Sequence, residues 1–359
     1  MNERYNRQII LTGFGNKAQE KLTAAKVLVI GAGGLGCPAL QYLAASGIGK
    51  IGLADDDTVA LSNLQRQVLY TTADIGRTKV EVAAERLTAM NPQIEIRPYP
   101  LQIRRNNIID LIENYDIIFD GTDNFETRYL INDACALLNK PLVFAAVFGY
   151  EGQLAIFNVK DQNGISTNYR DLFATPPKTG EIPNCVENGV IGVLPGIIGT
   201  LAAAEIIKLI TGIGKPLINT LLTYNMLNLQ HYQLLITPAI NNHSPSTTAA
   251  FLTMDSFTSI DAKELSKLQQ QKSTITIDVR EELETPLLDH TLYLKAPMSK
   301  FDDFLKREIT EEHVIFICAH GIRSVTAAEA FNEKYGTSKK AYSLKGGIAR
   351  WANELDLQT

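Results

Sequence analysis

The first 150 residues of this chain alternate short apolar runs with stretches that have helical spacing. The apolar runs predict strands at Val27–Ile30, Lys50–Ala54, Glu95–Tyr99, Asp116–Asp120 and Leu142–Ala146. Helical spacing and good helix formers predict helices at Gly36–Ser46, Lys79–Met90 and Asn124–Asn139. Strands that alternate with helices in this way are typical of βαβ units, so we expect an α/β fold with a parallel sheet.

The pattern changes beyond residue 150. Gly152–Val159 predicts another strand, Gly189–Gly212 predicts an apolar helix rich in Ala and Ile, and Leu221–Ile236 returns to strand character. Between the first two lies Asp161–Asn184, a long polar segment that contains three prolines. A loop of this length is usually functional or mobile, so this segment is a candidate functional loop.

A second domain is expected after a polar stretch. Thr237–Ala250 has almost no large apolar residue and predicts a linker. Beyond it, Thr274–Val279 and His313–Cys318 predict short strands, and Ser324–Lys334 predicts a helix. At 359 residues the chain exceeds the usual size of one hydrophobic core. We therefore expect a large α/β domain over residues 1–236, a linker over 237–250 and a smaller α/β domain over 251–359.

The composition is that of a globular protein, with 45% hydrophobic and 20% charged residues. A formal net charge of −5 argues against a nucleic-acid partner, because surfaces that bind phosphates are normally strongly basic. The N-terminus lacks the apolar stretch of a signal peptide, and no apolar run reaches membrane-spanning length. We therefore expect a cytoplasmic protein with no membrane partner.

The cysteines predict reduced thiols. Cys37, Cys135, Cys185 and Cys318 are far apart and form no C-x-x-C pair, so neither a disulfide framework nor a cysteine zinc site is indicated. Cys37 lies just inside a predicted helix, and Cys135 lies on an apolar helix face. We expect these two to be buried in the core.

Four glycines, Gly31, Gly33, Gly34 and Gly36, follow the first predicted strand and open the next helix. Such a loop allows a tight turn and a close approach of the backbone to phosphate, and the helix N-terminus favours negative charge. Asp55 follows the next strand, at about the spacing expected for an acid that binds a ribose hydroxyl. The loop alone does not distinguish NAD, FAD and ATP.

Two further strings, Ser62–Gln67 and Asp120–Asn124, favour ATP together with the single residue Lys79. Triphosphate chemistry needs cations and a metal-binding carboxylate, whereas a redox cofactor seldom needs an added Arg and Lys. Together with Tyr5–Ile9 and the glycine loop, these strings resemble the adenylating family of MoeB, ThiF and the ubiquitin-activating enzymes. The resemblance covers residues 5–236 and implies a Rossmann-like adenylation domain.

The resemblance implies a role for each matching residue. The backbone of Gly34 would lie on the phosphates, and Asp55 would hold the ribose. Side chains expected around the nucleotide and its triphosphate are Asn63, Arg66, Lys79 and Asn124. Asp123 would bind Mg²⁺, and Arg7 would reach the nucleotide site of the other subunit in a homodimer. Taken singly, Asp55 could instead belong to a solvated turn together with Asp56 and Asp57, and Arg66 and Lys79 could be exposed helix charges.

The family pattern breaks at two places. Relatives often bind a structural zinc through two C-x-x-C pairs, but Asn168–Asp171 and Asn241–Ser244 stand at the matching positions here. Because the thiolates are missing, we expect no zinc and a crossover loop held by packing. Cys185 does occupy the place of the family's crossover-loop cysteine. Only some members use that thiol chemically, so a catalytic and a passive role both stay open.

Cys318 lies where a predicted strand ends and a helix begins. Loop N–H groups and the helix N-terminus would stabilise a thiolate and a persulfide anion at this position. Asp278–Glu281, Cys318–Arg323 and Leu344–Trp351 together resemble a single rhodanese domain that covers nearly all of residues 251–359. A cysteine and an arginine in one loop also occur in phosphotyrosine phosphatases, but the first and third strings favour rhodanese.

The rhodanese resemblance assigns roles in this loop as well. It implies that Cys318 carries the persulfide in a loop that includes Gly321, and that Arg323 holds an anion. Asp278 and Arg280 would support the fold. We expect His320 to be an exposed loop residue and not a metal ligand.

Both resemblances, in this order, match fusions of a MoeB-like domain with a rhodanese domain. They imply that ATP and Mg²⁺ adenylate the C-terminal glycine of a small ubiquitin-like sulfur carrier that ends in Gly-Gly. Arg66, Lys79 and the metal on Asp123 would offset charge as pyrophosphate leaves. A persulfide on Cys318 would then attack the activated carbonyl, and reduction or attack by Cys185 would release a thiocarboxylate.

The implied partners are a second copy of the chain, the carrier and a sulfur donor such as a cysteine desulfurase. The pathway stays open among molybdopterin, thiamin and tRNA thiolation. Two alternatives also stay open: a sulfur-relay or scaffold protein that binds nucleotide without adenylating, and an NAD-dependent oxidoreductase. Arg66, Lys79 and Asp123 count against the oxidoreductase.

Overall fold

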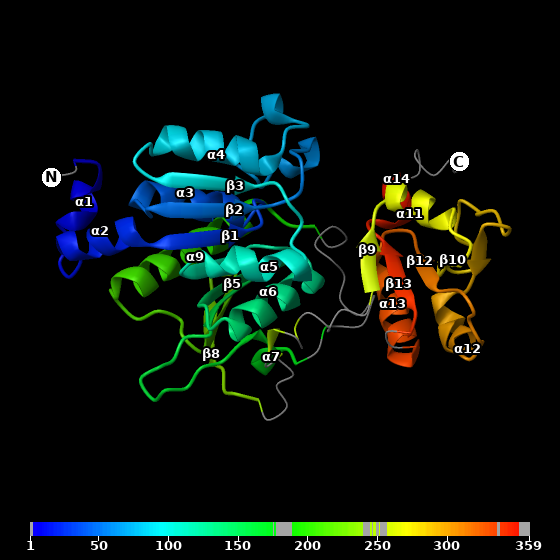
Figure 1. Cartoon of the computed structure of the whole chain (residues 1–359). Helices are drawn as coiled ribbons and strands as arrows, with labels where there is room; N and C mark the ends of the chain where they lie inside the picture. The colour runs from blue at the N-terminus through cyan, green and yellow to red at the C-terminus, as the bar shows by residue number, and fades with distance from the viewer. Residues whose placement is uncertain are drawn as a thin grey trace. The chain divides into compact units, whose positions relative to one another are not determined.

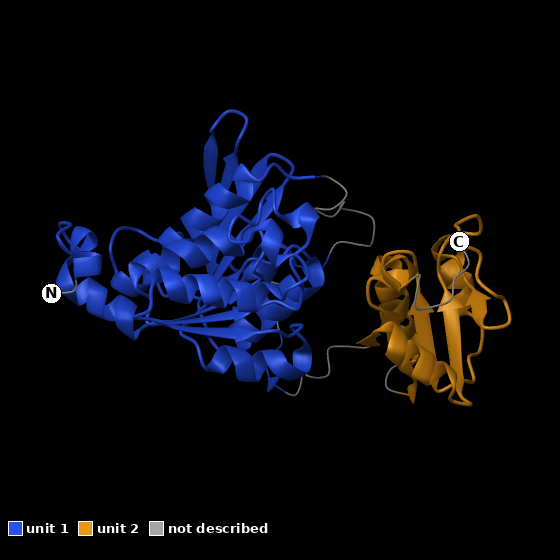
Figure 2. Cartoon of the chain, turned by 90° about the horizontal axis from the view of Figure 1, so that it is seen from above, with its two compact units in different colours: residues 1–176, 183–251 blue, residues 177–182, 252–359 orange. Residues whose placement is uncertain are grey.

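The computed structural model of the chain describes residues 3–174, 176, 189–239, 245, 247–248, 251, 257–335 and 338–351. These residues form two compact units, coloured blue and orange in Figure 2. The first unit holds the described residues up to Phe251, and the second holds those from Phe257 onward. The sequence-based boundary placed Phe251 in the smaller domain, but its side chain is fully buried in the first unit. There its carbonyl accepts a hydrogen bond from Arg105 at 2.8 Å.

The first unit is built on a mixed sheet with the strand order β3-β2-β1-β4-β5-β6-β7-β8. The strands are β1 Lys26–Ile30, β2 Lys50–Ala54, β3 Glu95–Tyr99, β4 Ile117–Asp120, β5 Leu142–Phe148, β6 Glu151–Phe157, β7 Thr220–Asn225 and β8 His231–Leu235. Neighbours from β3 to β5 pair in parallel, and those from β5 to β8 pair antiparallel. The order reverses between β1 and β4, and such a reversal opens a crevice at the carboxyl ends of the two strands.

Helices cover both faces of this sheet (Figure 1). They are α1 Asn6–Ile9, α2 Gly15–Ala24, α3 Gly36–Ser46, α4 Lys79–Met90, α5 Arg105–Glu113, α6 Phe125–Leu137, α7 Tyr169–Leu172 and α9 Val193–Thr211. Val27 and Val29 of β1 share a core with α3, α4 and α9, whereas Leu28 and Ile30 share one with α5 and α6. A strand buried on both faces is apolar throughout, which explains the apolar run in the sequence.

The predicted strands and helices of the first 150 residues lie within two residues of the observed ones, but three α-helices were missed. These are α1, α2 and α5. The signal for α5 was present, because Ile108, Leu111 and Ile112 have the spacing of one helix face, and all three are buried. The side chain of Asn107 also accepts the backbone N–H of Arg104 at 2.9 Å and so begins the helix.

Helix α9 is apolar enough and long enough to cross a membrane by length and composition alone, with a mean hydropathy of 1.8. The expectation that no apolar run reaches this length is therefore wrong for these residues. In the structure Leu194, Ile198 and Ile206 are fully buried in a core that α9 shares with α3. A helix that packs against a sheet and other helices in this way needs apolar residues on most of its surface.

The second unit is a parallel sheet with the order β11-β10-β12-β13-β9. Its strands are β9 Phe257–Ile260, β10 Thr274–Asp278, β11 Tyr293–Lys295, β12 His313–Ile317 and β13 Lys340–Leu344. Its helices are α11 Ala262–Gln269, α12 Phe301–Leu305, α13 Ile322–Tyr335 and α14 Gly347–Trp351. The carboxyl ends of parallel strands lie at one edge, so the loops after β10, β12 and β13 meet there. Short 3₁₀ helices also occur in both units. Those of the first unit are Glu3–Tyr5, Leu61–Asn63 and Thr72–Asp74, and the second unit contains Met298–Lys300.

Candidate functional site

The glycine loop lies at the reversal point of the first sheet, between the ends of β1 and β4. Gly31 has a φ of +96°, a backbone conformation that favours glycine, and a Cβ there would lie 2.7 Å from the carbonyl oxygen of Gly121. A Cβ on Gly36 would collide with the carbonyl of Gly31. The two loops therefore pack backbone against backbone, and only glycines allow this approach.

Asp55 fixes the glycine loop from the end of β2. Its carboxylate accepts the backbone N–H of Ala32 and the backbone N–H of Asp57, each at 2.8 Å. Burial raises the pKa of Asp55 above its ordinary value, although Lys79 and these two N–H groups act in the opposite direction. Asp55 thus lies directly beside the loop, where the sequence analysis expected the ribose.

Lys79 is the first residue of α4, and its side chain is buried. Its Nζ lies 3.0 Å from Asp57 and 4.0 Å from Asp55. Burial lowers the pKa of Lys79, but the two carboxylates outweigh it, so its pKa is raised. The alternative of an exposed helix charge is therefore wrong for Lys79. The negative charge of Asp123 also acts on this ammonium group and raises its pKa further.

Arg66 follows the short helix that ends at Asn63. Its Nη1 donates to the carbonyl of Ser62 at 3.0 Å. Its Cγ lies 3.4 Å from the point where a Cβ on Gly34 would stand, and Pro195 of α9 lies 3.2 Å from that point. Arg66 therefore rests half-buried against the glycine loop. The backbone of Asn63 accepts the N–H of Arg66 at 3.1 Å and so forms the turn that carries it.

The loop that carries Asp123 is anchored by an ion pair that the sequence analysis missed. Asp120 is fully buried and accepts the Nε of Arg128 at 3.3 Å and the backbone N–H of Thr122 at 2.9 Å. Arg128 also donates to the carbonyl of Thr122 at 2.8 Å. The side chain of Asn124 caps α6 by accepting an N–H at 2.8 Å. Asp123 is left exposed at the tip of the loop. The sequence offered one signal for this ion pair, because Arg128 stands in a mostly apolar stretch after Asn124 and a buried arginine needs a charged partner.

Arg7 lies apart from these residues within its own chain. It is exposed on α1, which contacts α2, and α2 leads into the amino end of β1 (Figure 1). The glycine loop follows the carboxyl end of the same strand, whose five residues span roughly 16 Å. Among the described residues, no hydrogen bond or ion pair joins Arg7 to the glycine-loop site.

Cys37 and Cys135 are buried in the core, as expected. Burial raises the pKa of Cys37 to about 12 and raises that of Cys135 well above its ordinary value. Both thiols are fully buried and are therefore inert core residues. Cys185 lies outside the described residues, so the choice between its catalytic and passive roles stays a prediction.

The first place where relatives carry zinc cysteines holds a polar network. Asp171 accepts the backbone N–H of Ala239 at 2.8 Å. Next to it, Arg170 forms a buried bidentate pair with Asp133 of α6, at 2.7 and 2.8 Å. Packing alone was expected here, and the structure adds these charged contacts. Among the described residues, no group of three or more His, Cys, Asp or Glu side chains gathers to hold a metal ion. Residues 241–244 lie outside the described ranges.

The Cys318 loop lies at the carboxyl edge of the second sheet. The Sγ of Cys318 is buried, accepts the backbone N–H of Gly321 at 3.1 Å and lies 3.5 Å from the Oγ of Ser324. Gly321 has a φ of +83°, and a Cβ there would lie 2.6 Å from the backbone nitrogen of Gly346. The turn after β13 thus packs against the cysteine loop, in which the N–H of Gly321 points toward the sulfur.

Arg323 is already paired. Its Nη1 and Nη2 donate to the two carboxylate oxygens of Glu284 at 2.5 and 2.6 Å. The anion that Arg323 holds in the structure is the carboxylate of Glu284, which takes one N–H from each terminal nitrogen. The expected role of Arg323 toward a substrate anion stays a prediction.

Asp278 and Arg280 act as supports for the fold, as expected. Arg280 is fully buried, and its guanidinium donates twice and its backbone N–H once to Asp278, each at 3.0 Å. Lys295 contacts the same carboxylate at 2.9 Å. His320 is exposed, also as expected.

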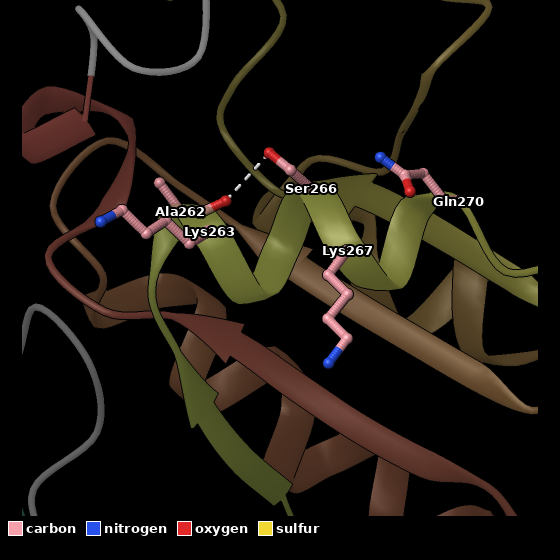
Figure 3. A pocket seen from close by; sticks show the side chains of 5 residues that line it. All are labelled: Ala262, Lys263, Ser266, Lys267 and Gln270. Carbon is pink, nitrogen blue, oxygen red and sulfur yellow. Dashed lines mark hydrogen bonds between the residues drawn. The ribbon is translucent and has the colours of Figure 1, made fainter.

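A hollow of about 320 Å³ beside α11 does not mark a site (Figure 3). Ala262, Lys263, Ser266, Lys267 and Gln270 line it. All five lie on or just after one helix, and the dashed bond in Figure 3 is a local contact from Ser266 to the carbonyl of Ala262. It is a surface groove, and the chemistry at Lys79 and Cys318 locates the two sites instead.

Comparisons with known proteins match both halves of the chain. The model of the ThiF family matches residues 5–246, and the rhodanese-like domain model matches residues 261–354. A probable adenylyltransferase/sulfurtransferase MoeZ of Mycobacterium tuberculosis is 38% identical over 98% of this chain and 93% of that protein. The adenylyltransferase and sulfurtransferase MOCS3 of Xenopus laevis is 35% identical over 98% of this chain and 86% of that protein.

Two further relatives cover mainly the first unit. A sulfur carrier protein adenylyltransferase of Thermus thermophilus is 49% identical over 63% of this chain and 83% of that protein. The crystal structure of E. coli MccB with AMPCPP and MccA has a TM-score of 0.60, covers 68% of this chain and 74% of its own, and supports the fold alone at 23% identity. The α/β fold and the two resemblances found in the sequence are thereby confirmed. The chain belongs to the ThiF family and carries a C-terminal rhodanese-like domain.

Proposed function

We propose that this chain adenylates the C-terminal glycine of a ubiquitin-like sulfur carrier with ATP and then converts that glycine to a thiocarboxylate. Relatives that span nearly the whole chain are named for adenylyl and sulfur transfer, and another is named for a sulfur carrier protein. The observation that carries the proposal is the buried Lys79 ammonium beside the glycine loop. An oxidoreductase has no need for a buried cation at this point, whereas a triphosphate does.

The first step joins the carrier to AMP. The glycine carboxylate attacks the α-phosphorus of ATP, a new C–O–P linkage forms, and pyrophosphate leaves with the electrons of the broken P–O bond. No general base is needed because the carboxylate is already ionised at neutral pH. The loop from Gly31 to Gly36 would hold the phosphates with its N–H groups and its helix N-terminus. Arg66 and Lys79 would offset the charge that develops on pyrophosphate.

Mg²⁺ is proposed as the metal of this step, with Asp123 as its protein ligand. Mg²⁺ usually binds one or two carboxylates together with phosphate oxygens and waters, and the exposed carboxylate of Asp123 fits this preference. The ion would neutralise phosphate charge when bound. The anchoring by Asp120 and Arg128 would keep the Asp123 loop in place, while Asn63 and Asn124 would contact the nucleotide from neighbouring turns.

The second step transfers sulfur. A persulfide on Cys318 attacks the carbonyl carbon of the acyl adenylate, a C–S bond forms, and AMP leaves. The product is an acyl disulfide between the carrier and Cys318. A thiolate, from Cys185 or from an external thiol, then attacks the Cys318 sulfur. This attack breaks the S–S bond and releases the thiocarboxylate. Cys318 lies against the N–H of Gly321, which can stabilise the anionic persulfide.

The working unit is proposed to be a homodimer in the cytoplasm, supplied by a sulfur donor such as a cysteine desulfurase. Support for the dimer comes from Arg7, which lies near the amino end of β1 while its own glycine loop lies at the carboxyl end. A second copy could bring this exposed arginine to the nucleotide site. The pathway is that of the sulfur carrier that the chain adenylates, whether for molybdopterin, thiamin or tRNA thiolation.

ATP–pyrophosphate exchange tests the adenylation step. Exchange should appear with a carrier that ends in Gly-Gly and vanish with the same carrier lacking its last glycine. Mass spectrometry of the carrier after addition of ATP and a sulfane donor should then show the thiocarboxylate. ATP binding without exchange, across carriers of the several pathways, would favour the sulfur-relay or scaffold alternative.

A further inference from the structure

Glu284 and Arg323 form an ion pair next to the sulfur-carrying thiol. Arg323 lies in the first turn of α13, directly after the Cys318 loop, and Glu284 belongs to the loop after β10. The geometry is bidentate, at 2.5 and 2.6 Å. These contacts lower the pKa of Glu284 to about 2, so its carboxylate is ionised at neutral pH. The positive charge of Arg323 beside the Cys318 loop is therefore neutralised by the negative charge of Glu284.

Glu284 is held in this position by its own turn. One of its carboxylate oxygens also accepts the backbone N–H of Glu281 at 2.7 Å, and its own N–H donates to the carbonyl of Glu281 at 3.1 Å. Contacts with the backbone of Glu281 thus hold Glu284 in place independently of Arg323. Its placement against Arg323 is a built feature of the loop, not the chance pairing of two long side chains.

The other charges near Arg323 do not restore a positive field. The charge of Glu281 acts on Arg323, and its carboxylate accepts two neutral donors of Ser299, at 2.7 and 3.1 Å. The nearby cations Arg280 and Lys295 are both bonded to Asp278. Together with Glu284 and Arg323, these groups carry three negative and three positive charges, so they leave no net positive charge to attract a dianion.

We propose that Glu284 is a specificity-determining residue that makes the Cys318 loop accept sulfur from a thiol persulfide in preference to thiosulfate. This inference rests on the sulfur-transfer half of the proposed function. Thiosulfate brings two negative charges to the loop and needs a free cation for its sulfonate group. A protonated persulfide, R–S–SH, has no negative charge on the reacting sulfur, so it needs no free cation in the loop.

The two donors react with Cys318 in the same way but leave different groups. With a persulfide, the Cys318 thiolate attacks the outer sulfur of R–S–SH and becomes Cys318–S–SH, while R–S⁻ leaves with the electron pair of the broken S–S bond. With thiosulfate, the same attack on the outer sulfur leaves Cys318–S–S⁻, and sulfite departs as a dianion. Only the second route must stabilise a dianion both on entry and on departure.

The test is Glu284→Gln, which removes the charge but keeps an oxygen to accept the N–H of Glu281. Sulfur transfer to cyanide is measured in the full chain with thiosulfate and with cysteine persulfide as donors. We expect kcat/KM for thiosulfate to rise about tenfold or more, through KM, while the value for cysteine persulfide changes less than about twofold. Sulfite should also inhibit the variant at lower concentration than it inhibits the wild type.

Three variants separate this role from a merely structural one. Glu284→Asp keeps the charge and should keep the preference for persulfide. Glu282→Gln removes an exposed charge whose nearest cation, Lys300, lies 3.5 Å away, and it should leave both donors unchanged. Adding Arg323→Gln to Glu284→Gln should abolish the gain with thiosulfate.

An unchanged or lower kcat/KM for thiosulfate in Glu284→Gln would overturn the proposal, as would an equal rise with both donors or with Glu282→Gln. If the wild type transfers sulfur from neither donor, the proposal fails together with the sulfur-transfer step. Pyrophosphate exchange does not involve this loop, so it would still test the adenylation step on its own.

Discussion

Asp171 accepts the backbone N–H of Ala239 at 2.8 Å and so joins two segments that lie 68 residues apart in sequence. Asp171 stands at the first place where relatives carry zinc-binding cysteines, and Ala239 lies just before the second. The carboxylate of Asp171 also accepts a hydrogen bond from the backbone N–H of Asn168 at 2.7 Å, which caps the N-terminus of the short helix α7. A hydrogen bond to a charged group can thus make the connection that a shared metal would otherwise make.

This contact predicts a zinc-free protein whose stability depends on Asp171. Treatment with a chelator should leave the thermal midpoint unchanged, and metal analysis should find no stoichiometric zinc. Asp171→Ala should lower the free energy of unfolding by about 1–3 kcal/mol, because it leaves two backbone N–H groups without their charged acceptor. The control Asp110→Ala, at an exposed position on α5, should cost less than about 0.5 kcal/mol. Bound zinc, or a midpoint that falls with chelator, would contradict the prediction.

Asp123→Ala should abolish ATP–pyrophosphate exchange without loss of stability. The carboxylate is exposed at the tip of its loop, so its removal leaves no buried group unpaired. Its proposed role is to hold the metal at the phosphates. The measurement is exchange at saturating carrier, together with urea unfolding of the same preparation. Near-normal exchange would remove Asp123 from the mechanism.

Arg66→Ala should slow pyrophosphate exchange by about a hundredfold or more, the usual cost of deleting one charge-stabilising group. The side chain rests against the glycine loop, where the leaving phosphates would lie. Arg97→Ala, which removes an exposed arginine from the edge strand β3, is the matched control and should keep its rate. Equal rates for the two variants would return Arg66 to the class of solvated charges.

Arg7 should act across a dimer interface. Alone, Arg7→Ala and Asp123→Ala should each have low exchange activity. In mixed dimers one site would contain both wild-type residues, so partial activity should return when the two chains are unfolded together and refolded. The recovered activity should follow the fraction of mixed dimers, measured with two affinity tags. Purified mixed dimers without activity would show that each site is complete within one subunit.

The two chemistries should be separable by mutation. Cys318→Ala should abolish sulfur transfer from thiosulfate or a persulfide and leave pyrophosphate exchange unchanged, because the two sites lie in different units. His320→Ala, which changes an exposed side chain of the same loop, should keep both activities. A loss of exchange in Cys318→Ala would show that the adenylation step depends on the thiol.

The sequence by itself was enough to identify the fold and both families. The reason is that short local strings carry this information. Glycines that directly follow an apolar strand predict a phosphate loop, and a cysteine between a strand and a helix predicts an anion-stabilising loop. Both depend on backbone geometry that neighbouring residues determine, and the observed φ values of Gly31 and Gly321 agree with it.

Only the tertiary structure decided which charges are neutralised. Glu284 and Arg323 are 39 residues apart and meet because β10 and β12 end at the same edge of a parallel sheet. Asp171 reaches Ala239 across an even longer stretch of 68 residues, and Lys79 becomes buried only when α4 packs beside β2. Sequence patterns report the periodicity of one element at a time, whereas an ion pair depends on the distance between two elements, which packing alone determines.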